Sequence, residues 1–208
     1  MTTILQISSS ARGSASRSTQ LASELSGRLL ARAGSDRLIE RDVAAEPVHP
    51  IDAAALAALG TPEAQRSPEQ RALVAGFDAL IAELQAADVL VLGVPMYNFA
   101  APVQLKAYVD AIARAGVTFR YTASGPEGLL KNKKVYVVFA RGGLHQGRAS
   151  DSQTPWMSTW LGFLGMADVE YVFAEGLDMG PESQAAGLAS ARQQIAELTG
   201  EQSFANAA

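Results

Sequence analysis

The chain has 208 residues, 48% of them hydrophobic and 18% charged, so it can bury one sizeable core and does not resemble a disordered protein. It carries 17 basic and 21 acidic residues, a formal net charge of -4, and the basic residues form no stripe, which argues against a general nucleic-acid-binding surface. The absence of cysteine excludes disulfides, thiolate nucleophiles and thiolate metal sites, so any redox chemistry requires a cofactor.

Further classes of protein are disfavoured by what the sequence lacks. The two histidines, His49 and His145, lie far apart, which excludes a His-rich metal site. The start MTTILQIS has no positively charged leader, and no apolar run reaches the roughly 18 residues of a membrane span. We therefore expect a single cytoplasmic domain over residues 1–200, a frayed tail at 201–208, and no metal, membrane or nucleic-acid partner.

The first half of the chain alternates strand and helix patterns. Residues 3–7 are a short apolar run typical of a buried strand, and residues 17–33 carry leucines at helical spacing. Residues 37–43 alternate weakly and predict a strand near an edge of the sheet. An Ala-rich helix at 51–60 and an amphipathic helix at 69–87 then predict the second crossover.

The second half continues the alternation, with apolar runs of strand length separated by helical patterns. Strands are predicted at 88–94, 135–140 and 169–174, and helices at 103–115, 154–164 and 181–199. Residues 117–134 are too polar and too rich in Gly and Pro to be regular throughout. This stretch is long enough to be functional.

Five strands alternating with helices predict the α/β class: a flavodoxin-like, doubly wound, five-stranded parallel sheet of order 2-1-3-4-5 with helices on both faces. In such sheets ligands bind outside the carboxyl ends of the strands, near the switch between the first and third. The segments SSSARGSASRS, PMYNFAAP and ARGGLHQG follow the first, third and fourth strands. All three are therefore expected at that one edge of the sheet.

The first segment predicts a phosphate site. It runs into a helix N-terminus, where unpaired N–H groups and the helix dipole favour an anion. Ser10, Ser16 and Ser18 can add hydroxyl donors, and Arg12 and Arg17 positive charge. The simpler alternative is a surface loop in which Ser16 caps the helix. Because neither GxGxxG nor GxxxxGK[ST] is present, dinucleotide or nucleoside-triphosphate binding through those motifs is disfavoured.

The second segment places large side chains at the ligand edge. Met96, Tyr97, Asn98 and Phe99 follow Pro95, which ends the strand. A planar tricyclic ring would explain them, since Met and aromatic side chains pack on its face and Asn98 can reach its polar rim. Alternatively, Met96 and Phe99 are ordinary core residues and Tyr97 a partly buried anchor.

The third segment has adjacent glycines, Gly142 and Gly143, directly after a central strand. Glycine lets a ligand approach the backbone, and two N–H groups can donate to a carbonyl such as the pyrimidine edge of a flavin. The alternative is a tight turn. His145 is a candidate to hydrogen-bond a substrate or donate a proton, although a lone histidine is more often structural.

Together, SSSARGSASRS, PMYNFAAPVQLKAYVDAIARAGVTFRYTASGPEGLL, ARGGLH and GFLGMADVEYVFAEG resemble the FMN-dependent NADH:azoreductase family of flavodoxin-like quinone and azo-dye reductases, over essentially the whole chain. The resemblance implies a homodimer with one FMN per subunit at the dimer interface, and NADH or NADPH as hydride donor. Matched by motif, the FMN-binding residues would be Ser10, Ser16, Arg17, Ser18, Met96, Tyr97, Asn98, Phe99, Ala140, Arg141, Gly142 and Gly143.

The resemblance also implies a substrate pocket and has one departure. Phe119, Tyr121 and Phe163, with His145, would line the pocket over the flavin, or the aromatics are core or dimer-interface residues. Ala140 replaces an expected serine, so a hydroxyl contact is lost there and backbone contacts remain.

The implied reaction is ping-pong and needs no protein nucleophile. A nicotinamide passes a hydride to the flavin and leaves, and then quinones are reduced to hydroquinones or azo compounds cleaved to aromatic amines; nitroaromatics would also fit a flat pocket. Two alternatives remain open at this stage: a flavodoxin-type electron carrier without a substrate pocket, and a flavin-free binding module of the same fold.

Overall fold

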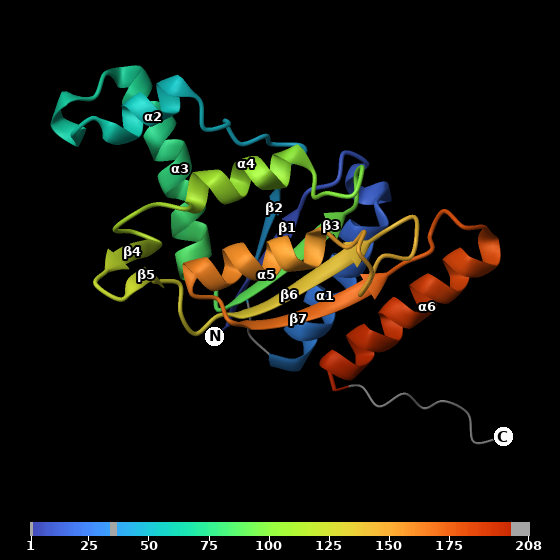
Figure 1. Cartoon of the computed structure of the whole chain (residues 1–208). Coiled ribbons are helices and arrows are strands. Elements are labelled where there is room, and N and C mark those ends of the chain that lie inside the picture. Colours follow the sequence, from blue (N-terminus) through green and yellow to red (C-terminus); the bar gives the residue numbers. More distant parts are fainter. Residues whose placement is uncertain (1, 34–36, 201–208) are drawn as a thin grey trace.

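A parallel sheet of five strands, in the order β2-β1-β3-β6-β7, forms the centre of the computed structural model, which describes residues 2–33 and 37–200 (Figure 1). The strands are β1 (Thr3–Ser8), β2 (Arg37–Asp42), β3 (Val89–Pro95), β6 (Lys134–Ala140) and β7 (Asp168–Ala174). Since β6 and β7 are the fourth and fifth strands of this sheet, the predicted order is confirmed, as is the edge position of β2. The tail predicted at 201–208 lies outside the described residues.

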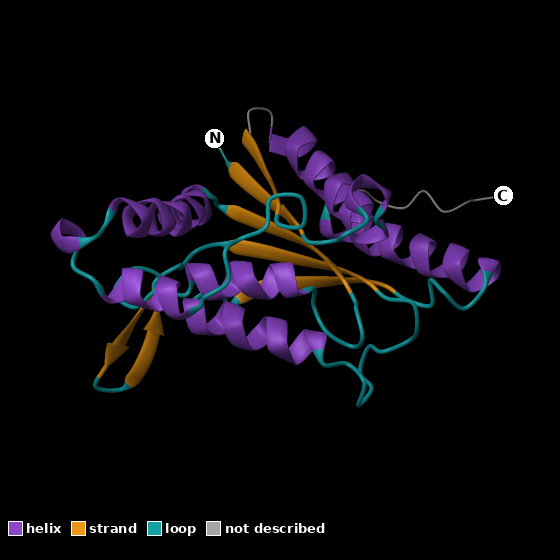
Figure 2. Cartoon of the chain, turned by 90° about the horizontal axis from the view of Figure 1, so that it is seen from above, coloured by secondary structure: helices purple, strands orange, loops and turns teal. Residues whose placement is uncertain are grey.

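Helices cover both faces of the sheet, as expected (Figure 2). The helices are α1 (Arg17–Ala33), α2 (Ala53–Gly60), α3 (Pro68–Ala86), α4 (Val103–Ile112), α5 (Gln153–Leu164) and α6 (Pro181–Leu198), with 3-10 turns η1 (Gly13–Ala15) and η2 (Glu63–Gln65). Helices α3, α4 and α5 pack on one face, whereas α1 and α6 pack on the other. Within the described ranges, no helix is long and apolar enough to cross a membrane.

The two faces carry separate hydrophobic clusters. In β3, Leu90 and Leu92 belong to the cluster under α3, α4 and α5, while Val91 belongs to the cluster under α1 and α6. Successive side chains of a strand point to opposite faces, so a strand covered on both sides must be apolar at every position. This double burial accounts for the uninterrupted apolar run of β3.

Gly93 brings the start of α1 against the sheet. A Cβ atom at this position would lie 3.0 Å from the carbonyl oxygen of Ser18 and 3.3 Å from Cβ of Ala22. The Ser9 hydroxyl donates to the Gly93 carbonyl at 3.0 Å. The N-terminus of α1 is thereby held at the carboxyl edge of the sheet, beside the end of β3.

The stretch 117–134 is more regular than the sequence indicates. It contains an antiparallel hairpin, β4 (Phe119–Thr122) and β5 (Gly125–Gly128), which was not predicted, although the stretch is not regular throughout, as expected. A hairpin of two four-residue strands with Gly and Pro in one of them has too little alternation to be detected from its pattern. Helix α4 also ends at Ile112, before the predicted 115, where the Thr118 hydroxyl donates to the Ile112 carbonyl at 2.6 Å.

Candidate functional site

A cavity of about 440 Å³ lies at the carboxyl edge of the sheet, and all three segments singled out in the sequence line it. A fourth segment, which follows β7, closes the cavity on the side of α6. The lining residues are Ser10, Arg12, Ala15, Ser16, Arg17, Gln20, Pro95, Met96, Tyr97, Ala140, Arg141, Gly142, Leu177, Asp178 and Gln184. The convergence expected from strand order is therefore present.

The serine segment forms the most polar wall of this cavity. Ser10, Ser16 and Ser18 are buried, and the hydroxyl oxygens of Ser16 and Ser18 lie 3.0 Å apart. The first turn of α1 contains no acidic residue, and its leading N–H groups have no intrahelical acceptor. Arg12 and Arg17 are exposed at the rim. Positive charge, hydroxyls and free N–H donors together suit a phosphate.

Tyr97 joins the second segment to the serine segment. Its hydroxyl oxygen lies 3.1 Å from the Ser10 Oγ and accepts a hydrogen bond from the Ala11 N–H at 3.2 Å. The Arg12 N–H donates in turn to the Ser10 Oγ at 3.3 Å. These hydrogen bonds hold the loop after β3 against the loop after β1.

The second segment then makes a left-handed turn at two residues other than glycine. Asn98 has φ 48° and Phe99 has φ 68°, and the N–H and C=O groups of Tyr97 and Ala100 are mutually hydrogen-bonded at 2.9 and 3.0 Å. Positive φ at such residues costs about 1–3 kcal/mol each and is concentrated at functional sites. Phe99 is 60% exposed, which rules out the core alternative for that side chain.

The third segment starts beside the second, since the Met96 N–H donates to the Ala140 carbonyl at 3.0 Å. Gly142 is required here by packing: a Cβ atom would lie 2.4 Å from Oδ2 of Asp178. The Gly142 and Gly143 carbonyls accept from Asp178 and Gly176 at 3.0 and 2.9 Å. Neither glycine N–H donates a hydrogen bond to any residue in the described part of the chain, and Gly142 is the one of the two that lines the cavity.

His145 lies just beyond these glycines and is half-buried. Its Nδ1 is 2.9 Å from the Ser150 hydroxyl, and its ring makes an edge contact with Phe99 at a centroid distance of 5.8 Å. It adjoins the second segment without lining the cavity. Over residues 2–33 and 37–200, no three His, Cys, Asp or Glu side chains are grouped to hold a metal ion.

The three aromatic residues predicted for a substrate pocket form a separate cluster. Phe119 lies 4.5 Å from Phe163 and 5.5 Å from Tyr121, measured between ring centroids. Phe119 is buried, whereas Tyr121 is 75% exposed. The hairpin that carries two of them lies at the other end of the sheet from the cavity (Figure 1). One chain therefore does not bring these residues to the site.

Comparison with known proteins shows to which family the chain belongs. A family model described as flavodoxin-like fold matches residues 2–199. The FMN-dependent NADH:quinone oxidoreductase of Burkholderia thailandensis is 57% identical over 198 residues, which cover 95% of this chain and 100% of the relative. The enzyme of that name from Dechloromonas aromatica is 57% identical over 195 residues, covering 94% and 98%. The chain belongs to the flavodoxin-like family of FMN-dependent NADH:quinone oxidoreductases.

Solved structures agree with this fold. An azoreductase from Bacillus anthracis superposes with a TM-score of 0.87 at 24% identity, covering 96% of this chain and 99% of the other. An FMN-dependent NADH-azoreductase of the same species, solved in complex with FMN, gives a TM-score of 0.85 at 21% identity, covering 96% and 100%. At these identities the likeness establishes the shared fold.

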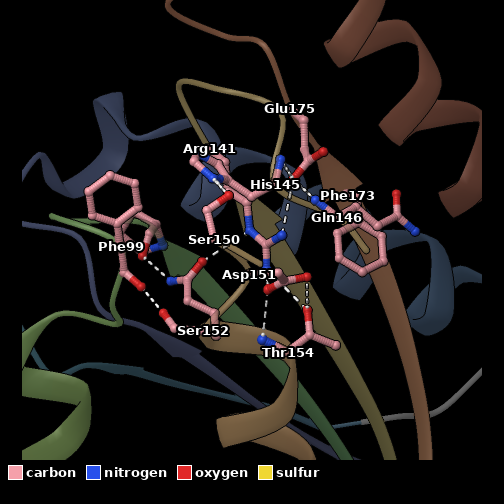
Figure 3. A network of polar contacts seen from close by, with 12 residues as sticks. Phe99, Arg141, His145, Gln146, Ser150, Asp151, Ser152, Thr154, Phe173 and Glu175 are labelled. Atoms are coloured by element: carbon pink, nitrogen blue, oxygen red, sulfur yellow. Dashed lines mark hydrogen bonds and ion pairs between the residues drawn. The ribbon is translucent and has the colours of Figure 1, made fainter. Parts of the chain in front are cut away.

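In this family member the side chain of Arg141 does not face the cavity. It is fully buried and forms ion pairs with Asp151 and Glu175, both at 3.0 Å (Figure 3). Burial alone would raise the pKa of Asp151, but hydrogen bonds from Thr154 and Arg141 outweigh it, and the pKa is lowered. With its side chain buried in this way, Arg141 lines the cavity through its main chain.

Sequence reasoning missed the fourth wall of the cavity. Leu177, Asp178 and Gln184 come from the segment between β7 and α6, which also follows a strand at the carboxyl edge. The position of that segment after the fifth strand was the available signal, because the ends of all parallel strands share one edge. Asp178 lines the cavity beside Gly142 and is the one carboxylate among the lining residues described.

Proposed function

We propose that this protein is an FMN-dependent NAD(P)H oxidoreductase that reduces quinones to hydroquinones and cleaves azo compounds to aromatic amines. The observation that carries the proposal is the cavity in which the buried Ser10 and Ser16 at a helix N-terminus share one lining with Tyr97 and Gly142. The names of the 57% identical relatives support NADH-dependent quinone reduction, and the azoreductase names of similar solved structures motivate the azo substrates. Nitroaromatic compounds belong to the acceptors that we propose to test.

The residues present fit FMN. Ser10, Ser16, Arg17 and Ser18 would hold the phosphate, because buried hydroxyls and free N–H groups converge there without a carboxylate in the helix turn. The 440 Å³ cavity continues from this wall past Tyr97 to the third segment. Its size and its elongated set of lining loops suit a phosphate joined to a planar ring.

The ring would lie against the second and third segments. Met96 to Phe99 would contact its face and edge, with Asn98 at the polar rim. Residues 140–143 would face the pyrimidine edge through main-chain groups, because Ala140 has no hydroxyl and the Arg141 side chain is buried elsewhere. The free N–H groups of Gly142 and Gly143 would stabilise negative charge on the ring carbonyls.

Bound FMN supplies the two-electron chemistry, accepting a hydride from NADH or NADPH and passing electrons to the acceptor. The chain itself would bind FMN, orient it and adjust the electronic properties of its ring. These tasks need no cysteine, and the chain has none. Donor and acceptor would use the same exposed side of the cavity, so the oxidised nicotinamide must leave before the acceptor binds. This is the basis for a ping-pong order. His145, next to Phe99, is our candidate to hydrogen-bond the acceptor.

We further propose a homodimer with the site at its interface. Phe119, Tyr121 and Phe163 are remote from the cavity of their own chain, so a role over the flavin requires a second copy. Tyr121 is 75% and Val103 74% exposed, which leaves apolar surface for an interface. Sedimentation of the FMN-bound protein tests this: a dimer supports the proposal, and a monomer at all micromolar concentrations contradicts it.

The reaction is tested by an anaerobic visible spectrum of the purified protein with FMN. We expect NADH to bleach the flavin band and a quinone to restore it, with no partner protein. Binding of FMN without bleaching by NADH or NADPH would favour an electron carrier instead. Failure to bind FMN at all would favour a flavin-free module of the same fold.

A further inference from the structure

Among the residues that the structure describes, Arg141 is the only charged one that is fully buried. All three guanidinium nitrogens donate: Nε to Gln153 Oε1 at 3.0 Å, Nη1 to Glu175 Oε1 at 3.0 Å, and Nη2 to Asp151 Oδ1 at 3.0 Å. The guanidinium carbon also lies 4.2 Å from the centre of the Phe139 ring. Nη2 also donates to the Thr154 Oγ1 at 3.2 Å, and the side chain is 0% exposed, so the guanidinium is bound within the protein and does not face the cavity.

The three partners of Arg141 hold three different segments of the chain, and Figure 3 shows two of these partners, Glu175 and Asp151. Glu175 Oε1 also accepts from the main-chain N–H groups of His145 and Gln146, at 3.0 and 2.9 Å, and so fixes the end of the third segment. Asp151 accepts from the Thr154 N–H at 3.1 Å and so fixes the start of α5. The guanidinium connects these anchors through one rigid, planar group.

Gln153 carries the connection to the second segment. Its oxygen accepts from Arg141, and its amide nitrogen donates to the carbonyls of Pro95 and Ala100 at 2.9 and 3.2 Å. These two carbonyls stand on either side of the left-handed turn at Asn98 and Phe99. The Ser152 hydroxyl donates to the Phe99 carbonyl as well. Strained positions of this kind persist only where their surroundings over-determine them.

We propose that Arg141 and Gln153 are positioning residues that hold the Asn98–Phe99 turn in place before the flavin ring binds. The inference deepens the proposed function and rests on it for the identity of the ligand. The turn stays left-handed because Gln153 brackets it, and Gln153 keeps its orientation because Arg141 binds its oxygen. The result is a preset contact surface for the ring, with little ordering left to occur on binding.

The test uses Gln153→Glu, which keeps an oxygen for Arg141 but removes both donors to Pro95 and Ala100. Gln153→Met removes these two bonds and the bond from Arg141 without adding charge, and it serves if the first variant does not fold. The matched control is Gln85→Glu, at an exposed position near the C-terminus of α3, away from the cavity. Hydrogen exchange of the apoprotein is measured together with the dissociation constants for FMN and riboflavin.

For Gln153→Glu we expect faster exchange in residues 96–100 only, and an affinity about tenfold lower for FMN and riboflavin alike, since the phosphate loop is not held by this residue. Arg141→Lys keeps the positive charge but removes the planar guanidinium with its several N–H donors. It should speed exchange both at 96–100 and at 142–146, because Gln153 and Glu175 each lose a partner.

The proposal is overturned if exchange at 96–100 in both Gln153 variants matches Gln85→Glu, or if exchange rises equally through α3 and the rest of the core, which would indicate general destabilisation. It is also overturned if only FMN affinity falls and riboflavin affinity does not. Failure of the wild-type protein to bind either flavin would refute the proposed function, while the exchange result on the apoprotein would still decide the positioning role.

Discussion

The hydroxyl of Tyr97 lies 3.1 Å from the hydroxyl of Ser10, across a sequence separation of 87 residues. This contact joins the loop after β3 to the loop after β1 at the switch point of the sheet. It places an aromatic side chain directly beside the proposed phosphate wall. The two loops are therefore parts of one site.

Tyr97→Phe should weaken FMN binding by about fivefold, the equivalent of one hydrogen bond of about 1 kcal/mol. The change removes the contacts to Ser10 and to the Ala11 N–H but keeps the ring. Fluorescence titration of the apoprotein with FMN measures it. Tyr136→Phe, in the first half of β6, is the control and should leave the affinity unchanged. Equal affinities in both variants would contradict the bridging role.

The phosphate wall can be tested separately from the ring. The double variant Ser16→Ala/Ser18→Ala should lower FMN affinity by about 10- to 100-fold, because hydrogen bonds to a charged group contribute about 1.5–3 kcal/mol. Riboflavin lacks the phosphate, so its affinity should stay within about twofold. Ser14→Ala, at an exposed position of the same loop, is the control. A parallel loss of riboflavin affinity would place the ring, and not the phosphate, at these serines.

Much of this site could be predicted from the sequence, because strand order alone determines where the loops meet. The apolar runs of β3 and β6 are unambiguous, and the ends of parallel strands share one edge whatever the errors in their boundaries. The pairing of Arg141 with Glu175 was not predictable. The two residues are 34 positions apart, and no pattern in either segment indicates that they are in contact.

The direction of the Arg141 side chain, in contrast, had a signal in the sequence. Side chains alternate along a strand, so Arg141 continues the face of Phe139, which is in the core under α5. Ala140 belongs to the other face. Extending this alternation past the last residue of β6 turns Arg141 toward Phe139, where its guanidinium is found. The β4–β5 hairpin gave no comparable signal because its strands are too short.

The hairpin is attached to α5 through two glycines, and this predicts an effect on stability. A Cβ atom at Gly128 would lie 2.1 Å from the Gly165 nitrogen, a backbone atom that cannot rotate away. Gly128→Ala should therefore lower the free energy of unfolding by about 1–3 kcal/mol. Gly162→Ala, in α5 with open space around it, should instead raise it by up to about 1 kcal/mol. Urea unfolding of both variants measures the difference.

If Gly128→Ala were as stable as the wild type, the close packing of the hairpin on the end of α5 would be wrong. The Leu130 N–H donates to the Leu164 carbonyl at 2.9 Å, beside the same contact. Faster hydrogen exchange at Leu130 in the variant would show that the hairpin has separated from α5 without loss of the sheet.

Asp151 predicts a dependence of stability on pH. Its pKa in the folded protein is lowered, since hydrogen bonds from Thr154 and Arg141 outweigh the effect of burial. A lowered folded pKa means that the ionised carboxylate stabilises the fold above the pKa of the unfolded chain, about 3.9. That contribution is lost as the pH falls through the folded pKa. Asp151→Asn should therefore lower the free energy of unfolding at pH 7 by about 1–3 kcal/mol.

The difference between the variant and the wild type should shrink as the pH falls below the pKa of the unfolded carboxyl toward the lower folded pKa, because Asp151 then becomes protonated. Urea unfolding at pH 7 and at successive lower pH values, down to the lowest at which the wild type still folds, measures how the difference between the two proteins changes. Asp110→Asn is the control, since Asp110 pairs with Lys106 on the exposed surface of α4 and should change stability by only about 0.3–0.5 kcal/mol at pH 7. A destabilisation of Asp151→Asn that stays the same at every pH, including below the pKa of the unfolded carboxyl, would mean that the carboxylate charge does not stabilise the buried guanidinium.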